Sequence, residues 1–200
     1  MIPYTCTMTT IDAAVAAIHR GLIVGMPTDT VYGVGVDPLN SNAVAALFEL
    51  KGRPDEKAIP VLVATVAQAL EIVDLPPEVE DMALRYWPGP LTLVLRRRFG
   101  VPDWVGDDEL GTVAVRIPDH PVVLDLLSAS GPLAVTSANR SGEPPALQEV
   151  EARALLGDGV AVYLEGRCPG GASSTIVDMT TDRPRLLREG PVGFGDLLGD

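Results

Sequence analysis

Residues 27–57 read PTDTVYGVGVDPLNSNAVAALFELKGRPDEK, and this stretch decides the fold. A short apolar segment over residues 22–26 runs into a polar loop, residues 27–38, that glycine and proline punctuate. Ser41 is the expected N-cap of a helix over residues 42–51, and the glycine and proline that follow end this helix. The stretch therefore predicts a buried strand, a polar loop and a helix that ends in Lys-Gly-Arg-Pro.

The same stretch holds the only two lysines among the 15 basic residues of the chain, Lys51 and Lys57, on either side of Arg53. Lysine places a compact charge near phosphate or carboxylate, whereas arginine offers a planar fork. Lys51 shares a helical stripe with Val44 and Leu47, so it extends the side that faces the core. These features favour an anion-handling site. The stretch alone leaves open that Lys51 and Arg53 only complement the negative end of the helix.

The composition is that of a folded globular chain. Hydrophobic residues make up 46% and aromatic residues 4%, so Val, Leu, Ile and Ala must build the core. The 200 residues suit one domain over residues 1–200, with a core at about 10–190 and a short tail at 191–200 that has little to pack against. The chain shows neither a membrane-length apolar run nor a signal peptide, so we expect a cytoplasmic protein without membrane association.

Charge and cysteine content exclude several classes of site. Cys6 and Cys168 are isolated and lack metal-ligand spacing, so we expect neither a zinc site nor a disulfide framework. The net charge of −12 disfavours general nucleic-acid binding, because phosphate contacts dominate that affinity. The run Arg96-Arg97-Arg98 is interpreted as a solvated strand end.

Strands and helices interleave along the chain, which predicts an α/β domain with a mixed, twisted sheet. Strands are expected over residues 22–26, 59–64, 91–98, 112–117, 133–135, 160–164, 174–179 and 185–189. Helices are expected over residues 12–20, 42–51, 65–73, 77–87, 122–130 and 149–156. Asp119 is the expected N-cap of the helix over residues 122–130, and His120 beside it is interpreted as structural.

A second polar loop, Thr136-Ser137-Ala138-Asn139, follows the strand over residues 133–135. Its hydroxyl and backbone N–H groups could cradle a phosphate or a ribose. The alternative is an ordinary Asx or Ser turn. The two common glycine-rich nucleotide loops, GxGxxG and GxxxxGK[ST], are absent from the sequence.

Six motifs in order resemble the YrdC-type L-threonylcarbamoyladenylate synthases: PTDTVYGVGVD, KGRPDEK, VAVRIPDHP, TSANRSG, SSTIVD and LLREG. The resemblance covers residues 10–190 and implies a single YrdC-like domain, a twisted sheet with a large concave cleft, and nucleotidyltransferase activity. Members of this family make threonylcarbamoyl-AMP and pyrophosphate from L-threonine, bicarbonate and ATP. A downstream tRNA threonylcarbamoyl transferase then modifies the adenosine beside the anticodon. The chain departs from the family pattern in having Asp29 and Val34 where PTET and YGL are frequent, and we expect no extra C-terminal domain like that of some relatives.

The resemblance also implies site residues. The residues implied for L-threonine are Thr30, Arg116, Val135 and Ser174. Those implied for ATP are Arg53, Lys57, Thr112, Ser137, Asn139, Pro145 and Arg188. Lys51 and Arg53 would be catalytic, with Lys51 at the junction of the two substrates. Mg²⁺ would be held mainly by the triphosphate and water, so no protein metal site is expected.

Two other functions are alternatives to the synthase. An RNA-binding or ribosome-maturation factor could use the same cleft, but the net charge of −12 disfavours this and direct tRNA binding. A carbamoyl-transfer module like that of hydrogenase-maturation proteins fits poorly, because those are long chains with zinc-finger segments.

Overall fold

The computed structural model describes residues 10–52, 58–140 and 142–198. The strands are β1 (Val24–Met26), β2 (Gly33–Val36), β3 (Val61–Leu62), β4 (Leu91–Arg96), β5 (Thr112–Arg116), β6 (Leu133–Ser137), β7 (Val162–Tyr163), β8 (Thr175–Asp178) and β9 (Arg185–Arg188). The helices are α1 (Thr10–His19), α2 (Ser41–Lys51), α3 (Val66–Ile72), α4 (Pro77–Tyr86), α5 (Pro121–Ser130), α6 (Glu149–Leu156) and α7 (Phe194–Leu198), with a 3₁₀ turn at Gly157–Gly159. None of these described helices has the length and apolar character needed to cross a bilayer.

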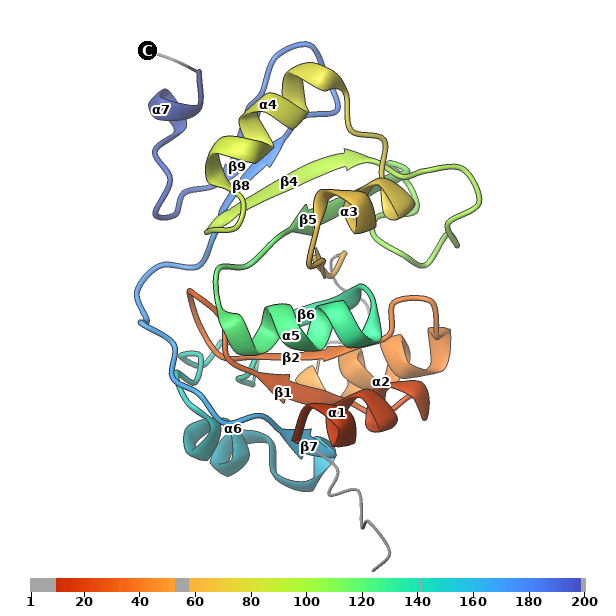
Figure 1. Cartoon of the computed structure of the whole chain (residues 1–200), viewed down its shortest axis with the longest axis vertical. Helices are drawn as coiled ribbons and strands as arrows, with labels where there is room; N and C mark the ends of the chain where they lie inside the picture. Colours follow the sequence, from red (N-terminus) through yellow and green to blue (C-terminus); the bar gives the residue numbers. More distant parts are fainter. Residues whose placement is uncertain (1–9, 53–57, 141, 199–200) are drawn as a thin grey trace, which may run out of the picture.

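In the described part of the chain, the nine strands form one mixed sheet in the order β7-β1-β2-β6-β3-β5-β4-β8-β9 (Figure 1). The pairs β1–β7, β3–β5 and β4–β8 are parallel, and the other neighbouring pairs are antiparallel. The prediction of an α/β fold with a twisted, mixed sheet is confirmed.

One half of the sheet, formed by β7, β1, β2 and β6, lies between two layers of helices (Figure 1). On one face, α1 and α5 pack around a buried cluster that includes Met26, Leu126 and Leu133. On the other face, α2 and α6 pack around a cluster that includes Val34 and Leu47. Because both faces are covered, these strands are apolar on both sides.

The other half, formed by β5, β4, β8 and β9, has α3 and α4 against one face. Leu91, Leu93 and Leu95 point into this core, as their alternation predicts. The alternate residues Thr92, Val94 and Arg96 point to the opposite face, where the pockets described below lie. The pleat of β4 thus separates the core from the candidate site.

Strand β2 corrects the prediction that residues 27–38 form one loop. Gly33 and Gly35 made the segment look like a turn, but they lie in the strand and oppose β6. A Cβ atom on Gly33 would lie 2.8 Å from Val135 Cγ1, and one on Gly35 would lie 2.7 Å from Val135 Cγ2. The glycines are therefore needed because Val135 packs directly on the β2 backbone.

Two predicted helix caps are wrong by one residue. Helix α2 begins at Ser41, and the Asn40 side chain accepts the capping hydrogen bond at 3.2 Å. His120, rather than Asp119, is the N-cap of α5 and makes no side-chain capping bond, while Pro121 opens the helix. In both places adjacent residues compete for the boundary, and the sequence pattern does not separate them.

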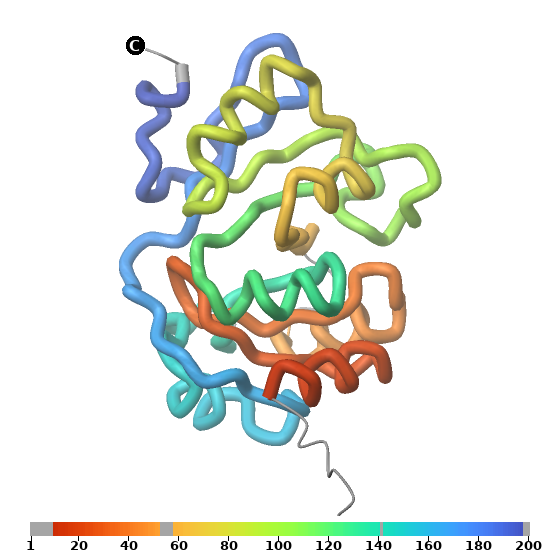
Figure 2. Tube along the Cα trace, viewed as in Figure 1, coloured from red at the N-terminus to blue at the C-terminus, as the bar shows by residue number. Residues whose placement is uncertain are grey.

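The C-terminal segment packs on the core, so the prediction of a tail with little to pack against is wrong. Val192 and Leu197 are buried in the same cluster as the apolar face of α4. The hydroxyl of Tyr86 donates to the carbonyl oxygen of Asp196 at 3.2 Å. Figure 2 shows this segment on the same side of the molecule as α4. Its apolar pattern is too short to predict a helix from the sequence.

The triple arginine after β4 differs from the prediction at its middle residue. Arg96 and Arg98 are exposed, as expected for a solvated strand end. The Arg97 side chain is 11% exposed and forms ion pairs with Asp103 at 3.1 Å and Asp108 at 3.3 Å. Arg97 thus ties the following loop to the end of β4.

Candidate functional site

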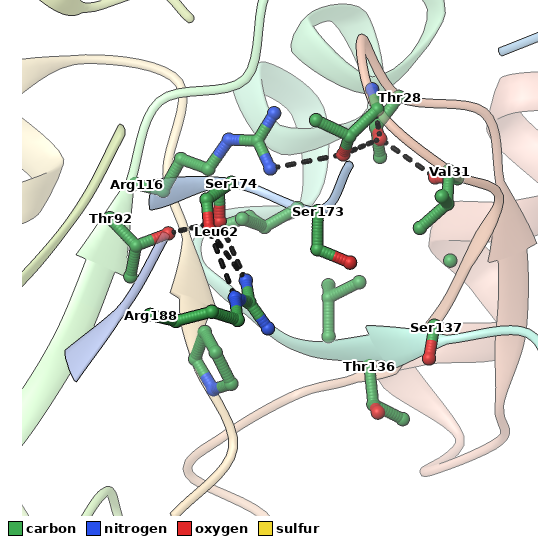
Figure 3. Close-up of a pocket in the computed structure, with 14 residues that line it drawn as sticks. Thr28, Val31, Leu62, Thr92, Arg116, Thr136, Ser137, Ser173, Ser174 and Arg188 are labelled. Atoms are coloured by element: carbon green, nitrogen blue, oxygen red, sulfur yellow. Dashed lines mark hydrogen bonds between the residues drawn. The ribbon is translucent and has the colours of Figure 1, made fainter. Parts of the chain in front are cut away.

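A pocket of about 150 Å³, which we call the central pocket, lies where the two halves of the sheet meet. Its walls come from the loop after β1, from β2, β3, β4, β5 and β6, and from the C-terminal strands (Figure 3). Six residues that the resemblance named line it: Thr30, Arg116, Val135, Ser137, Ser174 and Arg188. Segments far apart in the sequence are therefore brought together at one hollow.

Arg116, at the end of β5, is a buried cation in the wall of the central pocket. Its Nη2 donates to Oδ1 of Asp29 at 2.5 Å, and its Nε donates to the carbonyl oxygen of Gly89 at 2.9 Å. Burial lowers the pKa of Arg116, and the charge of Asp29 opposes this effect. Asp29 thus offsets the cost of keeping a charged guanidinium in the wall.

Arg188, in β9, lies on the same side of the central pocket as Arg116 (Figure 3). Its Nε and Nη2 donate to the carbonyl oxygen of Ser174 at 3.0 and 2.9 Å, and Nη2 also donates to Ser174 Oγ at 3.1 Å. Burial, and next the charge of Arg116, lower the pKa of Arg188. No carboxylate among the described residues forms an ion pair with Arg188. Two guanidinium groups, of which only Arg116 forms an ion pair with a described carboxylate, favour an anionic ligand.

Lys51 lies behind the polar loop at the end of β6 and is buried. Its Nζ donates to the carbonyl oxygen of Ser137 at 2.6 Å, to that of Asn139 at 2.6 Å and to Asn139 Oδ1 at 2.8 Å. Ser137 Oγ donates to the same Oδ1 at 2.6 Å. The prediction that Lys51 extends the core-facing side of α2 is confirmed. Three of its hydrogen bonds hold the loop whose Ser137 lines the central pocket.

Thr112 lies in a second, larger hollow of about 760 Å³ on the open face of β4, β5, β8 and β9. We call it the strand-face hollow. Pro60 lines both this hollow and the central pocket, so the two adjoin. Its volume falls within the roughly 300–1,000 Å³ of small-molecule sites. The two hollows together offer room for a ligand larger than an amino acid.

The remaining predicted residues lie beside the pockets or outside the described residues. Asn139 is buried and Pro145 is half-buried, and neither lines the two hollows. Ala146 donates its N–H to the carbonyl oxygen of Ala138 at 3.1 Å, which places the main chain near Pro145 next to the polar loop. The residues outside the described part are Arg53 and Lys57.

Three residues of the site were missed by sequence reasoning. Thr28 and Thr92 line the central pocket, and Asp29 holds Arg116 from behind it. The polar position of Thr92 between two buried leucines of β4 was an available signal, since it marks the face away from the core. For Asp29 only the fold, which brings β5 beside the loop after β1, reveals the contact.

The described side chains contain no group of three His, Cys, Asp or Glu residues positioned to hold a metal ion.

Asp178 in β8 lines the strand-face hollow and allows a stability test. Burial alone would raise its pKa, but hydrogen bonds from Thr180 and Arg185 outweigh burial and lower the pKa below its ordinary value. The charged form therefore stabilises the fold above about pH 3.9, and this contribution is lost as the pH falls through the lowered pKa. We expect Asp178→Asn to lower the free energy of unfolding by roughly 1 kcal/mol at pH 7. Urea unfolding of both proteins at pH 7 and at successively lower pH checks this: the difference should shrink as the pH falls, and a difference that stays constant would contradict it.

Comparisons with known proteins agree with this geometry. The profile of the Sua5/YciO/YrdC family, described as telomere recombination, matches residues 16–190. A Mycobacterium tuberculosis protein named provisionally as a threonylcarbamoyl-AMP synthase is 46% identical over 194 residues, which cover 94% of this chain and 89% of the relative. The threonylcarbamoyl-AMP synthase of Vibrio cholerae is 40% identical, over 80% of this chain and 87% of its own length.

Solved structures give the same result. The crystal structure of Pyrococcus abyssi Sua5 complexed with L-threonine superposes with a TM-score of 0.88 at 36% sequence identity. The match covers 96% of this chain and 59% of the Sua5 chain, so this chain spans about three-fifths of that relative.

Proposed function

This chain belongs to the Sua5/YciO/YrdC family, and from that premise we propose that it is a threonylcarbamoyl-AMP synthase. It joins L-threonine, bicarbonate and ATP and releases pyrophosphate, which makes it a nucleotidyltransferase. The observation that carries the proposal is the pair Arg116 and Arg188, which face one pocket with only Asp29 as a described counter-ion. Such a pocket suits crowded anionic substrates.

L-threonine occupies the central pocket. Arg116 binds its carboxylate, because a guanidinium presents parallel N–H donors to a carboxylate. Thr30 and Ser174 offer hydroxyl groups to the amine or the hydroxyl of the substrate, and Val135 contacts it through the backbone. The P. abyssi relative complexed with L-threonine supports L-threonine as the ligand.

ATP extends from the central pocket toward the strand-face hollow. Arg188 and Ser137 line the central pocket, and Thr112 lines the adjoining strand-face hollow. The residues that complete this set by resemblance are Arg53, Lys57, Asn139 and Pro145. Mg²⁺ would accompany ATP on its phosphates, because this ion keeps several waters and is usually bound through substrate phosphates. We assign no step to Mg²⁺.

The chemistry needs positioning and charge stabilisation more than a protein nucleophile. The amine of threonine and bicarbonate first give an N-carboxylate with loss of water. An oxygen of this carbamate then attacks the α-phosphorus of ATP, and pyrophosphate leaves. Because bicarbonate, the N-carboxylate and ATP are all anionic, fixed cations and N–H donors lower the barrier, and positioning contributes several kcal/mol more. Lys51 and Arg53 are the residues we assign to this stabilisation.

The joint substrate requirement tests the proposal. Purified protein should release pyrophosphate from ATP only when both L-threonine and bicarbonate are present, and mass spectrometry should detect threonylcarbamoyl-AMP. The bicarbonate-free arm uses buffer depleted of CO₂. Pyrophosphate release in the absence of L-threonine or in the absence of bicarbonate would contradict the proposal.

The product defines the next reaction. A tRNA threonylcarbamoyl transferase consumes the mixed anhydride in the cytoplasm, and the acidic charge of the chain disfavours a direct role in tRNA binding.

A further inference from the structure

Arg116 enters the central pocket with its guanidinium already held by the protein. Nη2 donates to Asp29 Oδ1 at 2.5 Å, Nη1 donates to Thr30 Oγ1 at 3.2 Å, and Nε donates to the Gly89 carbonyl oxygen at 2.9 Å. A guanidinium has five N–H groups. The bonds to described residues therefore leave one N–H on each terminal nitrogen for a ligand. These two N–H groups can bind both oxygens of one carboxylate.

The hydroxyl groups beside Arg116 have fixed proton directions. Thr28 Oγ1 donates to the carbonyl oxygen of Val31 at 2.7 Å, which uses its single proton. The 3.1 Å bond between the hydroxyls of Thr28 and Thr30 must therefore be donated by Thr30. Thr30 Oγ1 also accepts from Arg116, so one of its two acceptor positions is left. Toward a ligand, the Thr30 hydroxyl can only accept.

Two donors on Arg116 beside one acceptor on Thr30 match the carboxylate and the amine of one α-amino acid. We propose that Asp29 is the positioning residue for this half of the site: it fixes the Arg116 guanidinium, so that the two remaining N–H groups meet the carboxylate beside the acceptor that Thr30 offers to the amine. Asp29 acts from behind Arg116, because it does not line the central pocket. The inference rests on the proposed function for the identity of the amino acid.

The charge of Asp29 is as important as its shape. The side chains of Asp29 and Arg116 are 12% and 7% exposed, so water screens their attraction weakly. Arg188 adds a second guanidinium to the same pocket, and its pKa is lowered by burial and by the charge of Arg116. The Asp29 carboxylate reduces this repulsion. Without its charge, Arg116 can turn from Thr30 toward other acceptors.

Asp29→Asn removes the charge and keeps the size of the side chain. We expect KM for L-threonine to rise about 30-fold, in line with the loss of one charge-assisted hydrogen bond, while KM for ATP changes less than about twofold. Asp29→Glu restores the charge and should return most of the threonine affinity. Thr28→Val removes the acceptor that fixes the Thr30 proton, so KM for L-threonine should rise about 5-fold. The matched control is Asp103→Asn, which breaks an arginine pair away from the pocket and should leave both KM values unchanged.

Calorimetric titration of L-threonine into each variant separates this inference from the proposed function. If the wild type makes threonylcarbamoyl-AMP but Asp29→Asn binds L-threonine normally, the inference is overturned and the function stands. An equal rise in KM for threonine and ATP, or failure of Asp29→Glu to recover affinity, also overturns it. If the wild type does not turn over, the proposed function fails, and binding decides: threonine affinity lost in Asp29→Asn supports the inference, and no binding by the wild type overturns it.

Discussion

Arg116→Lys should lower kcat/KM for L-threonine by about 1,000-fold, or about 4 kcal/mol at 1.4 kcal/mol per decade. Lysine retains a positive charge for Asp29, but its ammonium group cannot present two parallel N–H groups to a carboxylate. The lysine side chain is also shorter and has no guanidinium group. Thr30 Oγ1 and the Gly89 carbonyl oxygen therefore lose the hydrogen bonds that Arg116 donates. KM for ATP should stay within about threefold, since Arg188 and Ser137 are unchanged. Steady-state kinetics with each substrate varied in turn measures both quantities.

Arg97→Lys is the matched control for this variant. Arg97 is also nearly buried and paired with aspartates, at 3.1 and 3.3 Å, but it lies away from the central pocket. The Arg97→Lys variant should lower the free energy of unfolding without changing the kinetics of the folded protein. A similar kinetic loss in both variants would show that the effect of Arg116→Lys is general damage to the fold.

Lys51→Met should reduce turnover at least 100-fold and also lower the free energy of unfolding by about 2–4 kcal/mol. Methionine keeps the length of the side chain but removes three hydrogen bonds to Ser137 and Asn139. The polar loop then loses the cation that holds its oxygens, and Ser137 no longer has a fixed place in the central pocket. Urea unfolding and pyrophosphate release on the same preparation test the two effects together.

Arg85→Met distinguishes the two roles of Lys51 that the sequence leaves open: part of an anion-handling site, or only a cation at the end of a helix. Arg85 and Lys51 are each the basic residue in the last turn of a helix, α4 and α2 respectively. If Lys51 only complemented the helix end, both variants would lose the same few tenths to about 1 kcal/mol. We expect that small loss for Arg85→Met alone. If Lys51→Met left the free energy of unfolding unchanged, this would contradict the role of Lys51 in holding the polar loop, even if the variant were inactive.

The sequence predicts most helices and strands because their patterns of apolar residues extend over enough positions to be recognised. The alternating leucines of β4 identify its core face, and the stripe through Val44 and Leu47 places Lys51 on the inner side of α2. The predictions fail where a tertiary contact decides. Gly33 and Gly35 look like turn residues until Val135 is seen to pack on them, and Leu197 is buried by a core far away in the sequence.

The functional site, too, could be predicted only in part from the sequence. Motifs that resemble a family identify which residues to expect, and six of them meet at the central pocket. Asp29 and Arg116 are 87 positions apart in the sequence, and Lys51 and Asn139 are 88 apart. No local pattern encodes contacts between residues so far apart.

Strand β3 has a mechanical consequence for this arrangement. It joins the two halves of the sheet through two residues, Val61 and Leu62, which pair with β5 on one side and with β6 on the other. Leu62 is also the register partner of Arg116. A change in the angle between the halves at β3 would therefore displace Arg116 relative to β6, so we expect bending of the sheet to alter the binding of the amino acid.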